Sequence, residues 1–271
     1  MQNNRNFDAA ELKARFNPEG SLLRRQQMKM LEMVKELDRI CRKYDIPYFL
    51  YGGTLLGAIR HDGFIPWDDD LDVGLLRKDY LRLMKVLPDE LPEHIVLQSN
   101  DTDKDYFLLF AKLRDRHSLL EEESPYDQVF KERGVYIDIF PFERVQLWAQ
   151  KLAHPLQGHT FKIFRTAKDM DVAMKKIRTL TWLNRHVTFP ALRFISKVTC
   201  GKTLTYDYGI PFHIVYDEKD IFPLTTHVFE GVQLSVPGNS HHMLQTQYGD
   251  YMQLPDIESI EGHVKKLEIY D

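Results

Sequence analysis

The alternation of apolar and polar positions predicts one long helix near the start of the chain. Between about residues 22 and 44, apolar side chains recur at steps of three and four, the spacing of one helix face. They are Leu31, Val34, Leu37, Ile40, Cys41 and Tyr44. Ser21 can cap the first turn, and Pro47 lies just beyond the last. The polar residues 1–20 are expected to fray or to lie on the surface.

Short apolar runs separated by helical patterns follow, and they predict a sheet flanked by helices. The predicted strands are 48–51, 70–76, 95–97, 107–113 and 135–141, and the predicted helices are 54–59 and 79–87. Gly52 and Gly53 separate the first strand from the first of these helices. Glycines at such a junction let backbone N–H groups approach an anion closely.

Residues 146–200 have a different pattern, which predicts two or three amphipathic helices. Their polar faces are basic and include Lys175, Lys176 and Arg178. Two arrangements are open for this helical insertion. It can pack on the core as a subdomain, or it can rest on an anionic membrane surface.

The chain returns to short strands after residue 200. Strands are predicted at 214–216 and 228–236, the second divided by a turn at Gly231, and a short helix at 241–248. We therefore divide the chain into a core (1–145), a helical insertion (146–200) and a C-terminal part (201–271) that completes the same unit.

Four carboxylates gather in the run Asp68-Asp69-Asp70-Leu71-Asp72. On a strand, Asp70 and Asp72 point to one face about 7 Å apart, and Asp68 joins them if the chain is extended there. Two such charges repel by roughly 2–3 kcal/mol at an effective dielectric constant near 20. A divalent cation removes that cost, and ligands that are all oxygen favour Mg²⁺ or Mn²⁺ over zinc. A solvated acidic turn is the alternative for a bare run of this kind.

Asp138 interrupts the apolar strand 135–141, and a buried carboxylate needs a partner. An arginine or a backbone N–H group could serve, and so could the cation of Asp70 and Asp72. Alternation places Lys112 and Arg114 on one face of a strand, either as ordinary solubilising residues or as phosphate contacts.

Three further residues near the acidic run are candidates for donor binding. Arg60 and His61 can contact phosphates. Trp67 can stack on a base or on a quaternary ammonium group, or it can belong to the core.

The string GGTLLGAIRHDGFIPWDDDLD (residues 52–72) closely resembles the LicD family, the bacterial phosphocholine transferases related to the fukutin group. Its glycine pair and Asp70-Leu71-Asp72 also look like the signature of the nucleotidyltransferase superfamily. The likeness continues in YIDIFP (136–141) and YGDYMQLP (248–255), and His263 follows the second of these. It is thin between about 145 and 220.

The resemblance implies an α+β fold with a nucleotidyltransferase-like mixed sheet, flanking helices and a helical insertion. It implies that Asp138 joins Asp68, Asp70 and Asp72 around Mg²⁺, with donor phosphates over Gly52-Gly53-Thr54. The donor would be CDP-choline or a related CDP-alcohol, and the acceptor a sugar hydroxyl of a cell-surface glycan precursor, free or lipid-linked. The segment 248–252 would line the donor or acceptor pocket, or pack as a closing lid.

Two other classes of protein would use some of the same residues. A glycosyltransferase also holds the metal of a nucleotide-sugar with an Asp-x-Asp strand, although it would place that strand after a Rossmann-like run that is absent here. A non-catalytic nucleotide-binding module would have a broken carboxylate set, whereas all the carboxylates are present.

The composition of the chain restricts its class of partner and its cellular compartment. The 271 residues carry a formal net charge of -4, so there is no general electrostatic footprint for nucleic acid. Cys41 and Cys200 have no metal-ligand spacing, and Cys41 is expected to be a buried thiol in a reducing compartment. There is no secretory h-region at the N-terminus and no apolar stretch of about 18 residues. These features favour a cytoplasmic protein, with a peripheral membrane contact open.

Overall fold

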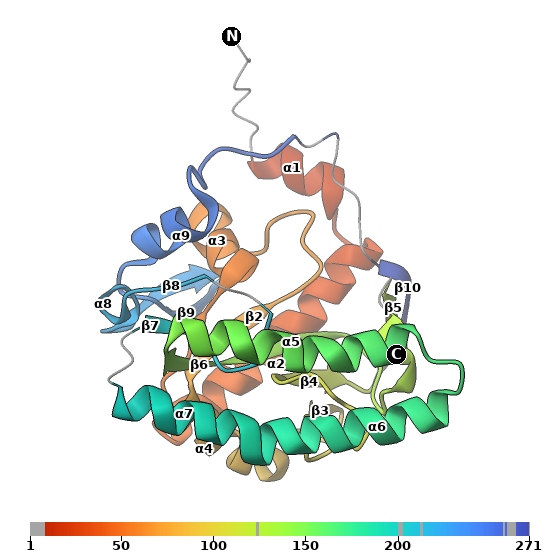
Figure 1. The fold of residues 1–271 in the computed structure, drawn as a ribbon. Coiled ribbons are helices and arrows are strands. Elements are labelled where there is room, and N and C mark those ends of the chain that lie inside the picture. The colour runs from red at the N-terminus through yellow and green to blue at the C-terminus, as the bar shows by residue number, and fades with distance from the viewer. Residues whose placement is uncertain are drawn as a thin grey trace.

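The fold is organised around one mixed β-sheet. The structure is a computed structural model, and it describes residues 9–122, 125–199, 203–211, 214–256, 258 and 264–270. The strands follow the order β1-β2-β6-β4-β3, and β7 also pairs with β6 (Figure 1). Their bounds are β1 Phe49–Leu50, β2 Asp72–Leu76, β3 Ile95–Gln98, β4 Ala111–Asp115, β6 Tyr136–Val145 and β7 Thr203–Tyr206. The pair β2–β6 is parallel and the other pairs are antiparallel, so the predicted α+β class is confirmed.

The long N-terminal helix is α2 (Leu22–Lys43), as the periodicity predicts. The Oγ atom of Ser21 accepts a hydrogen bond from the backbone N–H of Arg24 at 3.2 Å and so caps the first turn. The predicted apolar face is buried, including the thiol of Cys41, except that Tyr44 at its end is only partly buried. This face packs against β4 and β6, so burial of one helix stripe fixes α2 on the sheet.

Residues 1–20 were expected to fray or to lie on the surface, and the part that the structure describes lies on the surface as an ordered helix. Residues Ala9–Phe16 form the helix α1, and its Leu12 side chain is buried. The ring of Phe16 packs edge-on against Trp67, with 5.2 Å between ring centroids. This aromatic contact ties the N-terminal segment to the loop that carries the acidic run.

Two further helices flank the acidic strand. Helix α3 (Gly52–His61) precedes it and α4 (Arg77–Glu90) follows it, both slightly longer than predicted. The strand predicted at 107–113 begins only at Ala111. The preceding apolar residues do not pair in the sheet but pack in the interior elsewhere. The rings of Tyr106 and Phe107 pack with Phe130 and Phe164 in a separate aromatic cluster.

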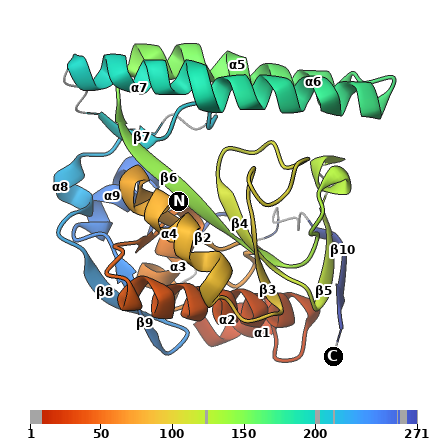
Figure 2. The same cartoon turned by 90° about the horizontal axis from the view of Figure 1, so that it is seen from below.

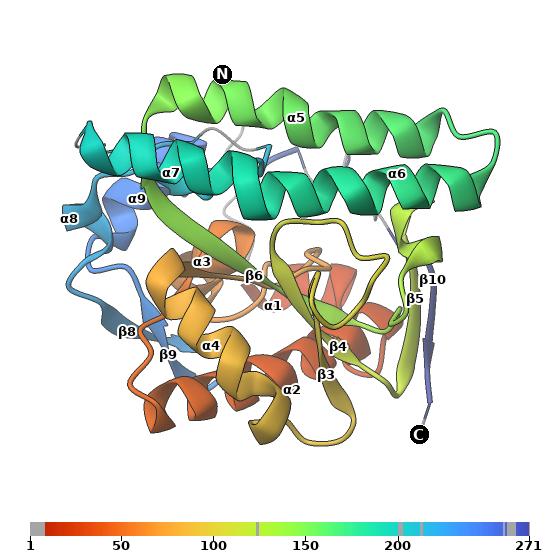
Figure 3. The same ribbon diagram turned by 60° about the horizontal axis from the view of Figure 1, so that its bottom comes forward.

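The predicted amphipathic helices form a layer along one side of the molecule (Figure 2). It consists of α5 (Leu147–Arg165), α6 (Met170–Leu183), the π-helical turn η2 (Asn184–Thr188) and α7 (Phe189–Val198). We call these elements the helical layer. Helices α6 and α7 form one rod through η2, and α5 lies beside it (Figure 3).

Helix α5 packs on the core partly through small and polar side chains. Gln150 Nε2 donates to the carbonyl oxygens of Tyr206 and Asp207 at 3.1 and 3.2 Å. Gln157 Nε2 donates to the carbonyl oxygen of Phe107 at 2.7 Å. The packed arrangement of the insertion is therefore confirmed for its inner face. The division of the chain into domains at residues 145 and 200 stays a prediction.

The C-terminal part contains α8 (Glu218–Ile221), the hairpin β8 (Thr225–Phe229) and β9 (Val232–Val236), and α9 (Ser240–Tyr248). The hairpin turn at Gly231 is confirmed. Strand β10 (Val264–Ile269) pairs with β5 (Ser118–Glu122), which η1 (Pro125–Val129) follows. The strand predicted at 214–216 is wrong, because Tyr216 makes only an isolated bridge to Leu204. Cys200 and His263 lie outside the described residues.

Candidate active site

A row of polar side chains crosses three strands of the sheet. Asp72 on β2 lies directly beside Asp138 on the parallel strand β6, and Asp138 lies opposite Lys112 on β4. Residues paired in this way point to the same face of a sheet. On the other face, Leu71 and Val73 are fully buried, as the alternation predicts. The strand pairing therefore brings the carboxylate of a distant strand beside the acidic run.

Residues 68–71 of the acidic run precede β2 as irregular backbone. Two buried glutamines hydrogen-bond to the carbonyl groups of this segment. Gln27 Nε2 donates to the carbonyl oxygen of Asp68 at 2.9 Å, and Gln26 Nε2 donates to that of Asp69 at 2.7 Å. Gln27 in turn accepts a hydrogen bond from Asn17 Nδ2 at 2.7 Å. Sequence reasoning missed this support. Its only signal was the presence of two adjacent polar residues near the apolar stripe of a long helix.

The glycine pair meets the carboxylates at the first turn of α3. A Cβ atom on Gly53 would lie 2.8 Å from Asp68 Oδ2, and one on Gly52 would lie 3.0 Å from Asp72 Oδ2. Gly52 also has a φ of +58°, which a side chain would strain. Thr54 Oγ1 accepts a hydrogen bond from the backbone N–H of Asp72 at 2.8 Å. Only glycines allow the helix N-terminus and the two carboxylates to come this close.

Burial and mutual repulsion shift the acidities of these carboxylates. Burial raises the pKa of Asp72 well above its ordinary value, and the charges of Asp70 and Asp138 raise it further. Burial likewise raises the pKa of Asp68, and Asp70 and Asp69 add to the effect. Keeping these groups ionised in the absence of a cation therefore costs free energy.

Lys112 neutralises part of this charge from within the protein. Its Nζ atom lies 2.7 Å from Asp138 Oδ1, close enough for an ion pair but not aligned as a hydrogen bond. The same ammonium lies 3.3 Å from the centroid of the Tyr136 ring. Burial raises the pKa of Asp138, and the charge of Lys112 acts against that rise. Lys112 is therefore a buried counter-ion within the row.

Arg114 lies on the same face of β4 as Lys112, but its guanidinium group is buried in the interior of the protein. Only 1% of its surface is exposed, and its three guanidinium nitrogens donate to Gln98, Gly134 and Asp127. The Nη2 bond to Asp127 Oδ2, at 2.9 Å, is also an ion pair. The structure therefore gives Arg114 a bracing position between β3, β4 and η1.

Arg60 and His61 occupy the last turn of α3. Arg60 donates to the carbonyl oxygens of Tyr251 and Gln253 at 2.7 and 3.4 Å, and its Nε donates to His61 Nε2 at 3.0 Å. Burial, together with the charges of Arg60 and Lys13, lowers the pKa of His61 to about 4. His61 is therefore a neutral acceptor at neutral pH.

Trp67 is half-buried between Phe16 and His61. Its ring meets both of them edge-on, with 6.3 Å between the centroids of Trp67 and His61. A stacking function for this ring stays a prediction.

The end of α9 lies beside the glycine pair, and it belongs to the segment 248–252 that the resemblance assigns to a pocket or a lid. The hydroxyl of Tyr248, at the end of α9, lies 3.9 Å from the Cβ position of Gly52. Burial raises the pKa of Tyr248, and the negative charges of Asp72, Asp68 and Asp70 raise it further. Tyr248 remains 42% exposed, so it borders the carboxylates from the solvent side. Arg60 holds the chain just beyond it.

The carboxylates fit a hard divalent cation by their chemistry. They supply oxygen only, and their raised pKa values reflect burial and, after it, a mutual repulsion that a cation would relieve. Within the described residues, no three His, Cys, Asp or Glu side chains are drawn together into a metal-binding group.

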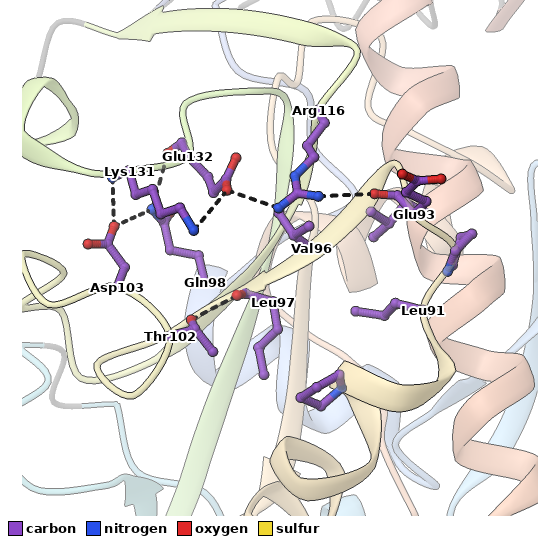
Figure 4. Close-up of a pocket in the computed structure, with 13 residues that line it drawn as sticks. Leu91, Glu93, Val96, Leu97, Gln98, Thr102, Asp103, Arg116, Lys131 and Glu132 are labelled. Carbon is purple, nitrogen blue, oxygen red and sulfur yellow. Dashed lines mark hydrogen bonds and ion pairs between the residues drawn. The ribbon is translucent and has the colours of Figure 1, made fainter.

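A separate surface cavity of about 300 Å³ lies at the β3 edge of the sheet (Figure 4). Its polar residues are bound to one another, for example Gln98 Nε2 to Asp103 Oδ2 at 3.0 Å. Arg116 pairs with Glu132 at 3.4 Å across its mouth. The cavity contains none of the candidate residues, and we assign it no part in the chemistry.

Comparison with known proteins agrees with this arrangement. The family model described as "LicD/FKTN/FKRP, nucleotidyltransferase domain" matches residues 45–191, more than half of the chain and all of the acidic run, β2 and β6. The chain belongs to this LicD family.

The relatives differ in how much of this chain they resemble. The lipopolysaccharide cholinephosphotransferase LicD of Haemophilus influenzae is 31% identical over 263 residues, which cover 89% of this chain and 95% of that protein. An uncharacterized protein of Rickettsia prowazekii, RP689, is 39% identical over 64 residues, or 24% of each chain. The human ribitol 5-phosphate transferase FKRP is 53% identical over 34 residues, only 7% of its length.

Proposed function

We propose that this protein is a metal-dependent transferase that moves a phospho-alcohol group from a CDP-alcohol to a sugar hydroxyl of a cell-surface glycan precursor. The observation that carries the proposal is the row of Asp72 and Asp138 beside the uncapped first turn of α3. The relative of nearly equal length, whose name describes a lipopolysaccharide cholinephosphotransferase, supports phosphocholine as the group. CDP-choline is proposed as the donor because the family resemblance implies it.

The carboxylates are proposed to hold Mg²⁺, with Mn²⁺ as a substitute. Asp70 and Asp72 are the principal ligands, and Asp68 and Asp138 complete the set. A bound ion of this kind neutralises the donor phosphates and polarises the phosphorus that is transferred. Lys112 keeps the charge of Asp138 balanced, which leaves the remaining negative charge concentrated on the acidic run.

The first turn of α3 is proposed to receive the donor phosphates. The N–H groups of Gly52, Gly53 and Thr54 belong to the helix N-terminus, whose dipole favours an anion. The side chain of the N-cap residue Tyr51 makes no capping bond to them. The acceptor oxygen would attack the phosphorus opposite the bond to CMP. As the new phosphoester bond forms, that bond breaks and CMP leaves.

The alcohol is proposed to lie near the aromatic side chains at the solvent side of the site. Trp67 and Tyr248 are the candidates, because an aromatic face attracts a quaternary ammonium group.

We place the reaction in the cytoplasm, at the inner surface of the membrane where the glycan precursor is lipid-linked. None of the helices in the described part of the chain has the length and apolar composition needed to cross a bilayer.

A product assay tests the proposal. The protein is mixed with a glycan acceptor and Mg²⁺, and with CDP-choline, CDP-ethanolamine, CDP-glycerol or CDP-ribitol in turn. Release of CMP with labelling of the acceptor is expected for CDP-choline, and EDTA should abolish it. Turnover of UDP-sugars without any turnover of CDP-alcohols would identify a glycosyltransferase instead. Failure to bind any nucleotide in the presence of Mg²⁺ would leave only a non-catalytic role.

A further inference from the structure

The helical layer carries a second apolar stripe on the side that faces away from the sheet. Helices with one buried stripe usually present polar residues to solvent. Here the exposed fractions are 50% for Trp148, 56% for Leu152, 58% for Trp182, 68% for Phe194 and 65% for Val198. We call these five residues, together with Leu183 and Val187, the outer face.

The residues of the outer face lie on helices that run beside each other. The start of α5 lies beside the end of α7, because Gln146 donates from its backbone N–H to Ser196 Oγ at 3.1 Å and from its side chain to the carbonyl oxygen of Thr199. The helices lie flat along one side of the molecule (Figures 2 and 3). Exposed apolar groups arranged over a flat surface indicate a binding surface rather than isolated exposed residues.

Charge distinguishes this side of the molecule from the rest. Residues 146–199 contain ten Lys and Arg residues and two Asp residues, a net charge of +8 in a chain whose total is -4. Three of the basic residues face inward and pair with the core: Arg178 with Asp105, Arg185 with Asp101 and Arg193 with Asp207. Arg178 therefore does not belong to a basic surface, contrary to its grouping with Lys175 and Lys176 on sequence grounds.

The other seven basic residues are exposed on the layer. They are Lys151, Lys162, Arg165, Lys168, Lys175, Lys176 and Lys197. In the described part of the chain, none of them forms an ion pair with an acidic side chain. The helical layer thus combines the exposed apolar residues of the outer face with exposed lysines and an arginine that pair with no acidic side chain of the described residues. This combination binds the interface of an anionic bilayer, where apolar groups enter the headgroup region and lysines contact lipid phosphates.

We propose that the outer face of the helical layer docks the protein on an anionic lipid bilayer. This proposal does not depend on the identity of the donor, because no residue of the outer face belongs to the carboxylate site. Docking would hold the carboxylate site at a fixed position relative to the membrane, where an acceptor carried by a lipid would be concentrated.

Vesicle binding of the full chain tests this proposal. Wild-type protein should float with vesicles of phosphatidylcholine containing about 30% phosphatidylglycerol, and at least about tenfold less with pure phosphatidylcholine. The variant Lys151→Glu/Lys175→Glu should lose at least about tenfold in affinity for the anionic vesicles. The matched control Lys35→Glu/Lys85→Glu makes the same change of net charge at exposed lysines of α2 and α4, and it should bind as wild type.

The apolar part has its own variant, Trp182→Ala/Phe194→Ala. Both side chains are more than half exposed, so folding should be retained and vesicle binding reduced. Turnover of the donor with a water-soluble acceptor should be unchanged in every variant. Absence of wild-type binding, or an equal loss in the control, would overturn the proposal. A dimer in sedimentation experiments that Trp182→Ala/Phe194→Ala abolishes would also overturn it, since a second copy would then cover the outer face.

Discussion

Asp72 and Asp138 lie side by side on the parallel strands β2 and β6, although 66 positions separate them in the chain. Adjacent positions on parallel strands place both carboxylates on one face. Burial raises the pKa of Asp72, and the charges of Asp70 and Asp138 raise it further. Lys112 extends the row on the far side of Asp138 and partly balances it. This pairing sets the carboxylates of two distant segments side by side, as the proposed metal site requires.

Removing one charge from the acidic run should abolish activity without unfolding the protein. Asp72→Asn keeps the shape of the side chain, and we expect transferase activity to fall at least about a hundredfold. The free energy of unfolding of the metal-free protein should stay constant or rise, because repulsion is relieved. Kinetics and urea unfolding measure the two effects. Asp69→Asn is the control, with near wild-type activity and stability within about 0.5 kcal/mol. Equal inactivity of the two variants would contradict the facial alternation.

A single methyl group at the glycine pair should disturb the site. Gly53→Ala places a Cβ atom 2.8 Å from Asp68 Oδ2, so the carboxylate has to move. We expect at least about a tenfold loss of turnover, measured at saturating donor. Gly158→Ala in the middle of α5 is the matched control, since nothing lies within 4 Å of its Cβ position. It should retain full activity and gain about 0.5–1 kcal/mol in stability. Full activity of Gly53→Ala would argue against close approach at this turn.

Lys112 and Asp138 should be strongly coupled in stability. Lys112→Met leaves a mostly buried carboxylate without its counter-ion, and we expect a loss of about 3–5 kcal/mol in the free energy of unfolding. Adding Asp138→Asn should recover a large part of that loss. The four proteins of this double-mutant cycle can be compared by urea denaturation in the presence of EDTA. Purely additive effects would mean that the two side chains do not interact.

His61 should make the protein sensitive to mild acid. Its pKa is about 4 in the folded protein, against an ordinary value of 6.5, so only the unfolded chain takes up a proton between these values. The contribution of His61 to stability is therefore complete above pH 6.5 and decreases as the pH falls to about 4. The variant His61→Gln should lose less stability than wild type over this range. His159→Gln, at an exposed histidine on α5, should follow the wild-type profile.

Local patterns predicted most of the elements, and contacts across the fold explain the exceptions. Residues close together in the sequence determine helix α2, the Gly231 turn and the two faces of β2. The pattern of apolar and polar residues is therefore enough to predict these features. The aromatic run before Ala111 has the composition of a strand. It forms a separate cluster because α5 and α6 offer it another apolar surface. Such a choice depends on partners that are distant in sequence.

The sequence by itself determined the family, the α+β class and the alternation along β2 that sets Asp72 against Val73. Those features follow from residue types at fixed local spacings. Only the tertiary structure decided that Lys112 is a buried counter-ion, that Arg114 braces the interior and that Gln27 supports the acidic run. It also decided which basic residues of the helical layer face the core and which face outward. The physical reason is that strand pairing and helix packing assign each polar side chain its partner, and a buried charge takes its function from that partner.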